Sequence, residues 1–336
     1  MFNNLTLLIT GGTGSFGYAF TRYILDNYKP KKLIIFSRDE MKQWKMKQEF
    51  KDNKKLRFFI GDVRDKDRMY RALEDVDYVV HAAALKIVPF AEYNPFEYIK
   101  TNILGAMNLI DAAIDQKVKK VVALSTDKAS SPINLYGATK LASDKLFSSS
   151  NSSYALGHKT KFAIVRYGNV MGSRGSVIPF FLNYIDKKKK YLPITDIRMT
   201  RFMITLEEGI KLVCHSFKDM VGGEIYVKKI PSIKILDLAK IISPKVKYKI
   251  IGIRPGEKLH EQMISEDESI YTYEYKDYYK ILPNINDWDK DNKRIKKGKK
   301  VPFGFAYKSD TNKSWVRGSQ LRSWIEHYRK NYKTVS

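Results

Sequence analysis

A short apolar run followed at once by a cluster of glycines constrains the fold of this chain more than any other feature. Residues 5–10 read Leu-Thr-Leu-Leu-Ile-Thr, and residues 11–17 read Gly-Gly-Thr-Gly-Ser-Phe-Gly. A helical pattern of apolar residues begins within that glycine segment. Glycines in this position allow a tight turn and let a pyrophosphate approach the helix N-terminus, although a flexible turn is the simpler alternative. Strand, glycine loop and helix in this order predict a dinucleotide-binding unit.

Short apolar strands and helices continue to alternate through the first half of the chain. Further strands are expected at residues 32–37, 56–60, 78–81, 120–124 and 162–166, and helices at 95–116, 135–147, 205–217 and 235–242. This alternation predicts an α/β fold with a Rossmann-type, doubly wound parallel sheet, whose ligands bind at the carboxyl ends of the strands. We expect residues 1–167 to form an NADP-binding core, joined by elements that return from the later chain. Residues 168–336 are expected to form a smaller α/β substrate-binding part and a C-terminal extension.

Composition argues against several other classes of protein. The formal net charge is +25, but lysines are spread along the whole chain, which favours solvated surface over nucleic-acid binding. Attraction of a phosphate-bearing ligand is the alternative for the densest runs, residues 187–190 and 293–300. Cys214 is the single cysteine, so an internal disulfide and a cysteine-based zinc site are excluded. Without a basic leader or a long apolar segment, the chain is expected to be cytoplasmic and free of the membrane.

Polar residues at the ends of the expected strands are candidates for binding the adenosine half of the cofactor. Ser37 ends the second strand and Arg38 follows it, at the place where the 2′-phosphate of NADP requires a cation. Asp39 comes next and keeps NAD possible, and Arg38 can instead be a solvent-facing residue at a helix start. Asp62 follows the third strand, where it can hydrogen-bond adenine or cap the helix that begins near Asp65.

A hydroxyl, a carboxylate and an amine follow one another at the end of the fifth expected strand, as Thr126, Asp127 and Lys128. Tyr136 and Lys140 come soon after, and their spacing places them on one face of a helix. A fixed ammonium lowers the pKa of a nearby phenol, so Tyr136 can accept a hydroxyl proton as hydride leaves the same carbon. This combination predicts a hydride-transfer site, with a surface ion pair as the alternative for Asp127 and Lys128.

The glycine motif, the Tyr136–Lys140 pair and the turn at residues 254–257, Arg-Pro-Gly-Glu, together resemble the extended short-chain dehydrogenase/reductase family. Within that family the chain is similar to the inverting UDP-N-acetylglucosamine 4,6-dehydratases. These are cytoplasmic lyases that start pseudaminic acid biosynthesis for flagellin glycosylation. The matching stretches are residues 82–101, 124–146, 166–181, 195–206 and 309–312.

The resemblance implies that the protein removes water from UDP-N-acetylglucosamine, with transient oxidation at C4 by NADP⁺ and inversion at C5. Retaining relatives carry an Asp-Glu pair where this chain has Asp127 and Lys128. Lys128 is therefore the expected base at C5, with a pKa lowered by burial and by cations such as Lys140, and Asp127 the expected acid at the C6 hydroxyl. A UDP-sugar epimerase, a retaining dehydratase and a non-enzymatic NADP-sensing protein are the alternatives.

The expected site residues form three groups. Catalytic roles are expected for Thr126, Asp127, Lys128, Tyr136 and Lys140. Cofactor binding is expected for Gly11, Thr13, Gly14, Ser15, Phe16, Gly17, Ser37, Arg38, Asp39, Lys42, Asp62, Val63, Ala82, Ala84, Lys86, Asn102, Tyr136 and Lys140. Substrate binding is expected for Lys86, Thr126, Asn169, Val170, Arg174, Thr195, Met199, Arg201, Arg254 and Glu257. Arg201 has a structural role as its alternative. The resemblance further implies a tightly bound, recycled NADP, no metal, and a homo-oligomer, either a dimer or a hexamer.

Overall fold

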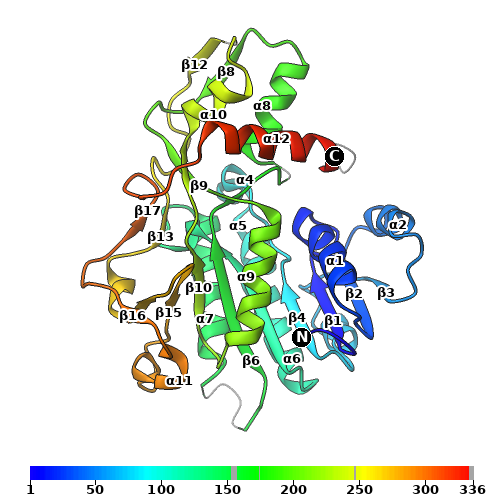
Figure 1. The fold of residues 1–336 in the computed structure, drawn as a ribbon. Coiled ribbons are helices and arrows are strands. Elements are labelled where there is room, and N and C mark those ends of the chain that lie inside the picture. The colour runs from blue at the N-terminus through cyan, green and yellow to red at the C-terminus, as the bar shows by residue number, and fades with distance from the viewer. Residues whose placement is uncertain (153–156, 174, 246, 333–336) are drawn as a thin grey trace.

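A single large sheet organises the computed structural model, which describes residues 1–336 except 153–156, 174, 246 and 333–336 (Figure 1). Ten strands lie in the order β16-β14-β15-β10-β6-β5-β4-β1-β2-β3. The parallel strands are β1 (Thr6–Thr10), β2 (Lys32–Ser37), β3 (Leu56–Ile60), β4 (Tyr78–His81), β5 (Lys120–Thr126), β6 (Lys161–Tyr167) and β10 (Ile225–Lys228). The expected parallel sheet is therefore confirmed, and its strand order reverses next to β1 as in other doubly wound folds.

Helices cover both faces of this sheet because successive strand residues point to opposite sides. Leu7 and Ile9 of β1 pack in one apolar cluster, and Leu8 packs in the other. The first cluster includes residues of α1 (Ser15–Asn27), α2 (Glu40–Glu49) and α9 (Leu206–Asp219). The second includes residues of α3 (Lys66–Ala72), α6 (Gly105–Asp115) and α7 (Leu135–Ser149).

The helix expected at residues 95–116 is in fact interrupted. It consists of α5 (Pro95–Ile99), a π-helical turn (Lys100–Leu104) and α6, and it follows the short helix α4 (Val88–Tyr93). The π-helical turn contains no proline or glycine that would signal a break, so the sequence pattern does not reveal it. The π-helical turn carries Asn102, whose side chain donates to the carbonyl of Leu85 at 3.0 Å.

The tyrosine- and lysine-rich region at residues 271–300, which shows little periodicity in the sequence, extends the main sheet. It supplies the antiparallel edge strands β14 (Thr272–Glu274), β15 (Tyr278–Ile281) and β16 (Lys299–Lys300), with the short helix α11 (Asn292–Ile295) between the last two. These strands are too short for a periodic pattern to be visible, and the pairing of β15 with β10 is a long-range contact.

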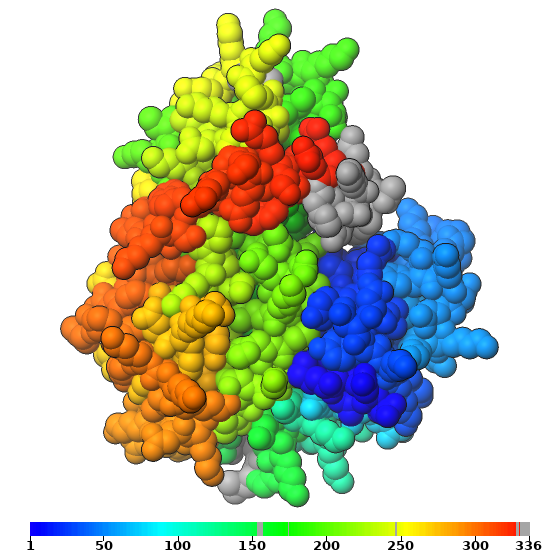
Figure 2. All heavy atoms as spheres, viewed as in Figure 1, coloured from blue at the N-terminus to red at the C-terminus, as the bar shows by residue number. Residues whose placement is uncertain are grey.

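A smaller α/β part lies above the carboxyl ends of the parallel strands (Figure 1). It contains β7 (Asn169–Val170), β8 (Tyr191–Ile194), β9 (Thr200–Ile204), β11 (Ser232–Lys234), β12 (Lys247–Ile250), α8 (Val177–Asp186), α10 (Ile235–Ile242) and α12 (Gly318–Tyr332). Two further strands, β13 (Gln262–Ile264) and β17 (Tyr307–Lys308), pair beside it. Figure 2 shows the C-terminal segment, in red, running across the surface of this upper part.

Candidate active site

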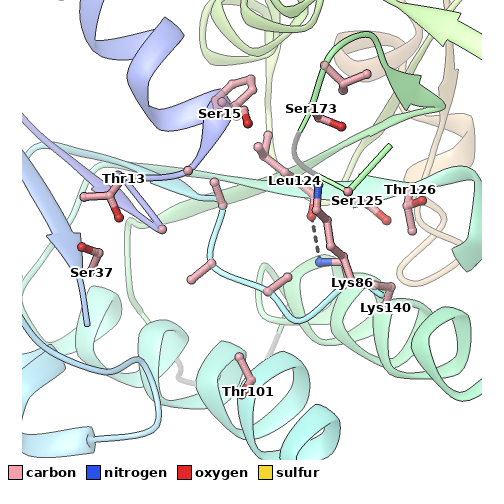
Figure 3. A pocket seen from close by; sticks show the side chains of 18 of the residues that line it. Thr13, Ser15, Ser37, Lys86, Thr101, Leu124, Ser125, Thr126, Lys140 and Ser173 are labelled. Carbon is pink, nitrogen blue, oxygen red and sulfur yellow. Dashed lines mark hydrogen bonds between the residues drawn. The ribbon is translucent and has the colours of Figure 1, made fainter. Parts of the chain in front are cut away.

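A cleft of about 640 Å³ opens at the carboxyl ends of the parallel strands (Figure 3). Among the expected residues, those that line it are Gly11, Thr13, Gly14, Ser15, Phe16, Ser37, Arg38, Asp39, Lys42, Asp62, Val63, Ala82, Ala84, Lys86, Thr126, Lys128, Tyr136, Lys140, Asn169 and Val170. The cleft is also lined by residues outside the expected site groups: Phe36, Gly61, Ala83, Thr101, Leu124, Ser125, Tyr167, Gly168, Ser173, Gly175, Ser176 and Leu206. Most of these adjoin a predicted residue, so extending each motif by one position would have found them.

The glycine loop forms a cradle that has no room for side chains. Gly11 has a φ of +64°, and a Cβ there would lie 2.9 Å from the carbonyl oxygen of Ala82. A Cβ on Gly17 would lie 2.1 Å from the carbonyl oxygen of Gly12. Helix α1 begins at Ser15 without a side-chain cap and without an acidic residue in its first turn. Backbone N–H groups and the positive end of the helix dipole therefore meet the cleft here, and they fit the pyrophosphate of a dinucleotide.

Acidic and basic side chains are already paired at the far end of the cleft, beyond β2 and β3. Asp39 caps α2 by accepting from the backbone N–H of Lys42 at 2.9 Å, and the two side chains form an ion pair of 2.6 Å. Asp62 forms ion pairs with Arg64 at 2.7 Å and with Arg38 at 3.5 Å. Burial alone would raise the pKa of Asp62, but hydrogen bonds from Arg64 outweigh it and the pKa is lowered.

Helix α3 is capped by Asp65, whose carboxylate accepts from the backbone N–H of Arg68 at 2.9 Å. Asp62 is therefore not the cap of that helix, and its side chain lines the cleft. Residues of the cofactor group that do not line the cleft are Gly17, which packs inside the glycine loop, and Asn102. Asn102 accepts from the backbone N–H of Leu85, so it holds the loop after β4 against the π-helical turn.

The hydroxyl, carboxylate and amine at the end of β5 form one connected group. Thr126 is the last residue of the strand, and its hydroxyl donates to Asp127 Oδ1 at 2.9 Å. A 3₁₀ turn (Asp127–Ala129) then brings Lys128 Nζ within 3.0 Å of the same oxygen. The side chain of Asp127 is 1% exposed and that of Lys128 is 20% exposed. This is a buried pair with its ammonium at the cleft, and the alternative of a surface ion pair is wrong.

A second carboxylate, which the sequence motifs did not indicate, also contacts Lys128. Glu261 Oε1 lies 3.0 Å from Lys128 Nζ, and its side chain is 2% exposed. Burial alone would lower the pKa of Lys128, but the charges of Asp127 and Glu261 outweigh it and the pKa is raised. The expectation of a lowered pKa for Lys128 is therefore wrong for this structure, because two carboxylates face the ammonium. Burial raises the pKa of Asp127 despite the opposing charge of Lys128.

Tyr136 and Lys140 both line the cleft from the first turns of α7. Lys140 Nζ donates to the carbonyl of Leu124 at 2.8 Å, which ties the helix to β5 (Figure 3). Burial raises the pKa of Tyr136 to about 12, and Lys128 is the main cation that opposes this rise. The expectation that Lys140 lowers the pKa of this phenol is therefore wrong here, since burial dominates and the ammonium that favours the phenolate belongs to Lys128.

A buried ion network lies beside this group. Arg166 of β6 is fully buried, and its Nη1 lies 2.9 Å and 3.0 Å from the two carboxylate oxygens of Glu268. Its Nη2 lies 3.3 Å from Asp144 Oδ2, which also accepts from the hydroxyl of Ser125 at 2.8 Å. The network joins β5, β6 and α7 to the segment before β14. Because the residues of this network lie far apart in the chain, no spacing pattern in the sequence indicates it.

Several residues expected to bind substrate lie outside the cleft. Met199 packs in the apolar core of the upper part, and Thr195 is buried. In the turn after β12, the exposed side chain of Arg254 forms an ion pair of 2.9 Å with the more buried side chain of Glu257. Their substrate-binding roles stay predictions, and Arg174 lies outside the described residues. Arg201 donates to the carbonyl of Lys258 at 2.9 Å and is 5% exposed, which agrees with the structural alternative.

Among the described residues, no group of three or more histidine, cysteine, aspartate or glutamate side chains is gathered as a metal would require. None of the described helices combines the length and the apolar character needed to cross a bilayer.

Comparisons with known proteins agree over nearly the full chain. A family model described as polysaccharide biosynthesis protein matches residues 7–283. A UDP-N-acetylglucosamine 4,6-dehydratase (inverting) of Campylobacter jejuni subsp. jejuni serotype O:2 is 57% identical over 332 residues, covering 97% of this chain and 99% of that protein. A UDP-glucose 4-epimerase of Rickettsia bellii is 44% identical and covers 93% of both chains.

A solved structure is similar as well. The X-ray structure of Pen from Bacillus thuringiensis matches with a TM-score of 0.88 and 40% identity, over 98% of this chain and 99% of that one. These matches agree with the Rossmann-type sheet and with the Tyr136–Lys140 pair at its cleft, and together they identify the family of this chain. The chain belongs to the polysaccharide biosynthesis protein family, within the extended short-chain dehydrogenases/reductases.

Proposed function

We propose that this protein is an inverting UDP-N-acetylglucosamine 4,6-dehydratase that uses NADP. The observation that carries the proposal is the buried Asp127–Lys128 pair, whose ammonium lines the cleft together with Tyr136. A hydride-transfer site needs the tyrosine, but only an elimination needs an additional acid and base beside it. The inverting dehydratase of Campylobacter jejuni, 57% identical to this chain, supports the same reaction.

The residues of the cleft fit a nicotinamide dinucleotide along its whole length. Gly11, Gly14 and Ser15 would hold the pyrophosphate through the glycine loop and the start of α1. Arg38 and Lys42 line the adenosine end, where Asp39 and Asp62 are already paired with cations, and this favours NADP over NAD. A bound nicotinamide would supply the hydride acceptor for C4 of the sugar and the hydride donor for C6.

The first step is removal of the proton of the C4 hydroxyl by Tyr136. The phenol lies in the cleft with Thr126, and Lys128 is the nearby cation that favours its phenolate. Lys140 holds α7 against β5 through the carbonyl of Leu124, which keeps the phenol in position. The ketone that results at C4 makes the proton at C5 acidic.

The elimination then needs a neutral amine at C5 and a protonated acid at the C6 hydroxyl at the same moment. Lys128 and Asp127 share one proton along a hydrogen bond of 3.0 Å. Transfer of that proton from the ammonium to the carboxylate produces both reactive forms without exchange with solvent. Lys128 takes the C5 proton, Asp127 gives its proton to the departing hydroxyl, and water leaves. The pair then carries its resting charges again.

Inversion at C5 requires that the new proton arrives on the face opposite to Lys128. Tyr136, protonated in the first step, is our candidate for this donor. Asn169 and Val170 of β7 line the cleft on the side of the upper part and would contact the sugar nucleotide. We propose that residues 168–336 supply most of this contact and that 1–167 hold the cofactor. We further propose a cytoplasmic homo-oligomer whose keto-sugar product enters pseudaminic acid synthesis.

The decisive experiment is incubation of the purified protein with NADP and UDP-N-acetylglucosamine, followed by mass spectrometry. Loss of one water supports the dehydratase. A product of unchanged mass but altered C4 configuration would instead support a UDP-sugar epimerase, the activity in the name of the Rickettsia bellii relative. Nuclear magnetic resonance of the dehydrated product distinguishes inversion from retention at C5.

A further inference from the structure

Glu261 is a buried carboxylate that contacts the reacting lysine without lining the cleft. Its Oε1 lies 3.0 Å from Lys128 Nζ, while its Oε2 is buried and accepts no hydrogen bond from the described residues. Burying a carboxylate with an unsatisfied oxygen is costly unless a nearby charge compensates for it. The compensating charges here are the ammonium of Lys128, which the elimination uses, and the guanidinium of Arg201.

The backbone of Glu261 is fixed from both sides by one buried serine. Its N–H donates to Ser309 Oγ at 2.9 Å, and its carbonyl accepts from the backbone N–H of Ser309 at 2.8 Å. Ser309 is fully buried, and its hydroxyl lies 2.7 Å from that of Thr200. The segment before β13 is thus attached to β9 and to the segment after β17. This arrangement sets the carboxylate in place independently of Lys128.

Charges on every element packed around Glu261 act on the same proton equilibrium. Asp127 and Lys128 face it from the 3₁₀ turn after β5, and Tyr136 adjoins them on α7. Arg201 of β9 lies 3.5 Å from Glu261 Oε1. The turn that precedes Glu261 contributes Glu257, which lies 3.6 Å from that arginine, and Lys258, whose Nζ donates to the carbonyl of Ser130 at 2.8 Å.

We propose that Glu261 is a positioning residue for the elimination, which holds the ammonium of Lys128 beside Asp127 and keeps the shared proton on this pair. The inference rests on the proposed function, because it concerns the acid and base of that reaction. Glu261 is not among the residues that line the cleft, and its contact with a cleft residue is the ion pair with Lys128, through which we expect it to act.

The proton movement is balanced with Glu261 charged throughout. In the resting state Asp127 and Glu261 are carboxylates and Lys128 is an ammonium. One N–H bond of Lys128 breaks and one O–H bond of Asp127 forms, which leaves a neutral amine that still donates an N–H to Glu261. After the amine has taken the C5 proton and Asp127 has protonated the leaving hydroxyl, the resting charges return. Glu261 keeps the amine from turning away between these two events.

The test of this proposal is the variant Glu261→Gln, which removes the negative charge of the side chain and keeps its shape. A nearby negative charge favours protonation of both Lys128 and Asp127, so its loss moves both limbs of the kcat–pH profile to lower pH, by about one unit or more. The KM for the sugar nucleotide stays unchanged, because Glu261 does not line the cleft. Glu261→Asp retains the charge but withdraws it by one methylene, and it is expected to shift the profile less, in the same direction.

The matched control is Glu266→Gln, because Glu266 is an exposed residue of the same segment that pairs with Lys308. Its pH profile is expected to equal that of the unmodified protein. If Glu261→Gln only lowers the melting temperature, or lowers kcat equally at all pH values, the proposal is wrong and Glu261 is a structural ion-pair partner. The Glu261→Asp variant decides the same question should Glu261→Gln not fold.

A second readout does not depend on activity. The titration of Lys128 can be followed by nuclear magnetic resonance of carbon-13-labelled lysine, with its signal identified by its loss in Lys128→Met. We expect Lys128 to lose its proton at lower pH in Glu261→Gln than in the unmodified protein, and an unchanged titration would overturn the proposal. Absence of water loss from the sugar in the unmodified protein would contradict the proposed function, whereas this titration would still report on Glu261.

Discussion

The ammonium of Lys128 lies 3.0 Å from Asp127 Oδ1, although the two residues are adjacent in the chain and both are largely buried. Neighbouring residues on a strand point to opposite faces, so this contact requires the 3₁₀ turn that begins at Asp127. The turn places the carboxylate of Asp127, which is fully buried, against the ammonium of Lys128, which lines the cleft. The first prediction concerns this pair.

Replacing Lys128 with alanine is expected to abolish water loss while leaving the cofactor bound. General acid–base catalysis by one side chain typically contributes a factor of about 10² to 10⁴ in rate, and kcat should fall by at least that range. Oxidation at C4 should persist, visible as absorbance of the reduced nicotinamide. Lys145→Ala on the exposed face of α7 is the control. Undiminished turnover in Lys128→Ala would show that another group is the base.

Replacing Arg38 with alanine tests the choice of cofactor. Its guanidinium lines the adenosine end of the cleft, and its side chain is 53% exposed, so removal should leave folding unaffected. The preference for NADP over NAD, measured as the ratio of the two kcat/KM values, is expected to fall by about tenfold or more, as for loss of a charge-assisted contact. Arg57→Ala, an exposed change on β3, should leave the ratio as it was. An unchanged ratio in Arg38→Ala would contradict our assignment of the 2′-phosphate.

Replacing Gly17 with alanine tests the glycine cradle. The new Cβ would lie 2.1 Å from the carbonyl oxygen of Gly12, so the loop must move. Overpacking of this kind typically costs about 1–3 kcal/mol in the free energy of unfolding, and cofactor affinity should fall as well.

The matched control is Gly209→Ala, because the nearest atom to a Cβ at Gly209 is 3.8 Å away and the residue lies inside helix α9. The free energy of unfolding of Gly209→Ala should equal that of the unmodified protein or exceed it by up to about 1 kcal/mol. Denaturant unfolding and cofactor titration of both variants provide the comparison. Equal stability of the two alanine variants would show that the loop adapts freely.

Replacing Arg166 with methionine is expected to lower the free energy of unfolding by about 3–5 kcal/mol. The change leaves Asp144 and Glu268 without their shared cation, and Asp144 is 2% exposed. Arg198→Ala breaks an ion pair with Asp196 whose arginine side chain is 68% exposed, and stability should hardly change. Chemical denaturation measures the free energy of unfolding of both variants. A small effect in Arg166→Met would mean that Asp144 and Glu268 are protonated or hydrated.

His81 should make the protein less stable as the pH falls. Burial, together with the charge of Lys140, lowers the pKa of His81 from 6.5 to about 3. Only the unfolded chain then binds a proton below pH 6.5, so the free energy of unfolding declines on acidification by up to about 1.4 kcal/mol per pH unit.

The replacement His81→Asn removes this titrating group and retains a polar partner for the Thr10 hydroxyl, which lies 2.9 Å from the His81 ring. Unfolding free energies measured between pH 6.5 and pH 5 should therefore fall less steeply in the variant, since most carboxylates are still ionised in that window. Identical slopes for both proteins would show that the folded protein takes up the proton.

The order of elements in the first half of the chain could be predicted because each element leaves a local pattern. A strand buried on both faces is a short apolar run, and a helix at a dinucleotide site needs glycines before it. Thr126 and Tyr136 could likewise be recognised from neighbours close in the chain. The interruption of the helix at Lys100–Leu104 could not be predicted, because this π-helical turn contains no proline or glycine that would signal it.

By itself, the sequence determined the fold class, the dinucleotide cleft and the chemical types of Asp127, Lys128 and Tyr136, since these depend on residues near one another in the chain. Only the tertiary structure decided the charge around Lys128. Glu261, just before β13, lies 3.0 Å from the ammonium of Lys128, and Arg201 of β9 lies 3.5 Å from Glu261; only folding brings these residues together. A pKa depends on every charge and on the burial at a point in space, and neither is recorded in local spacing.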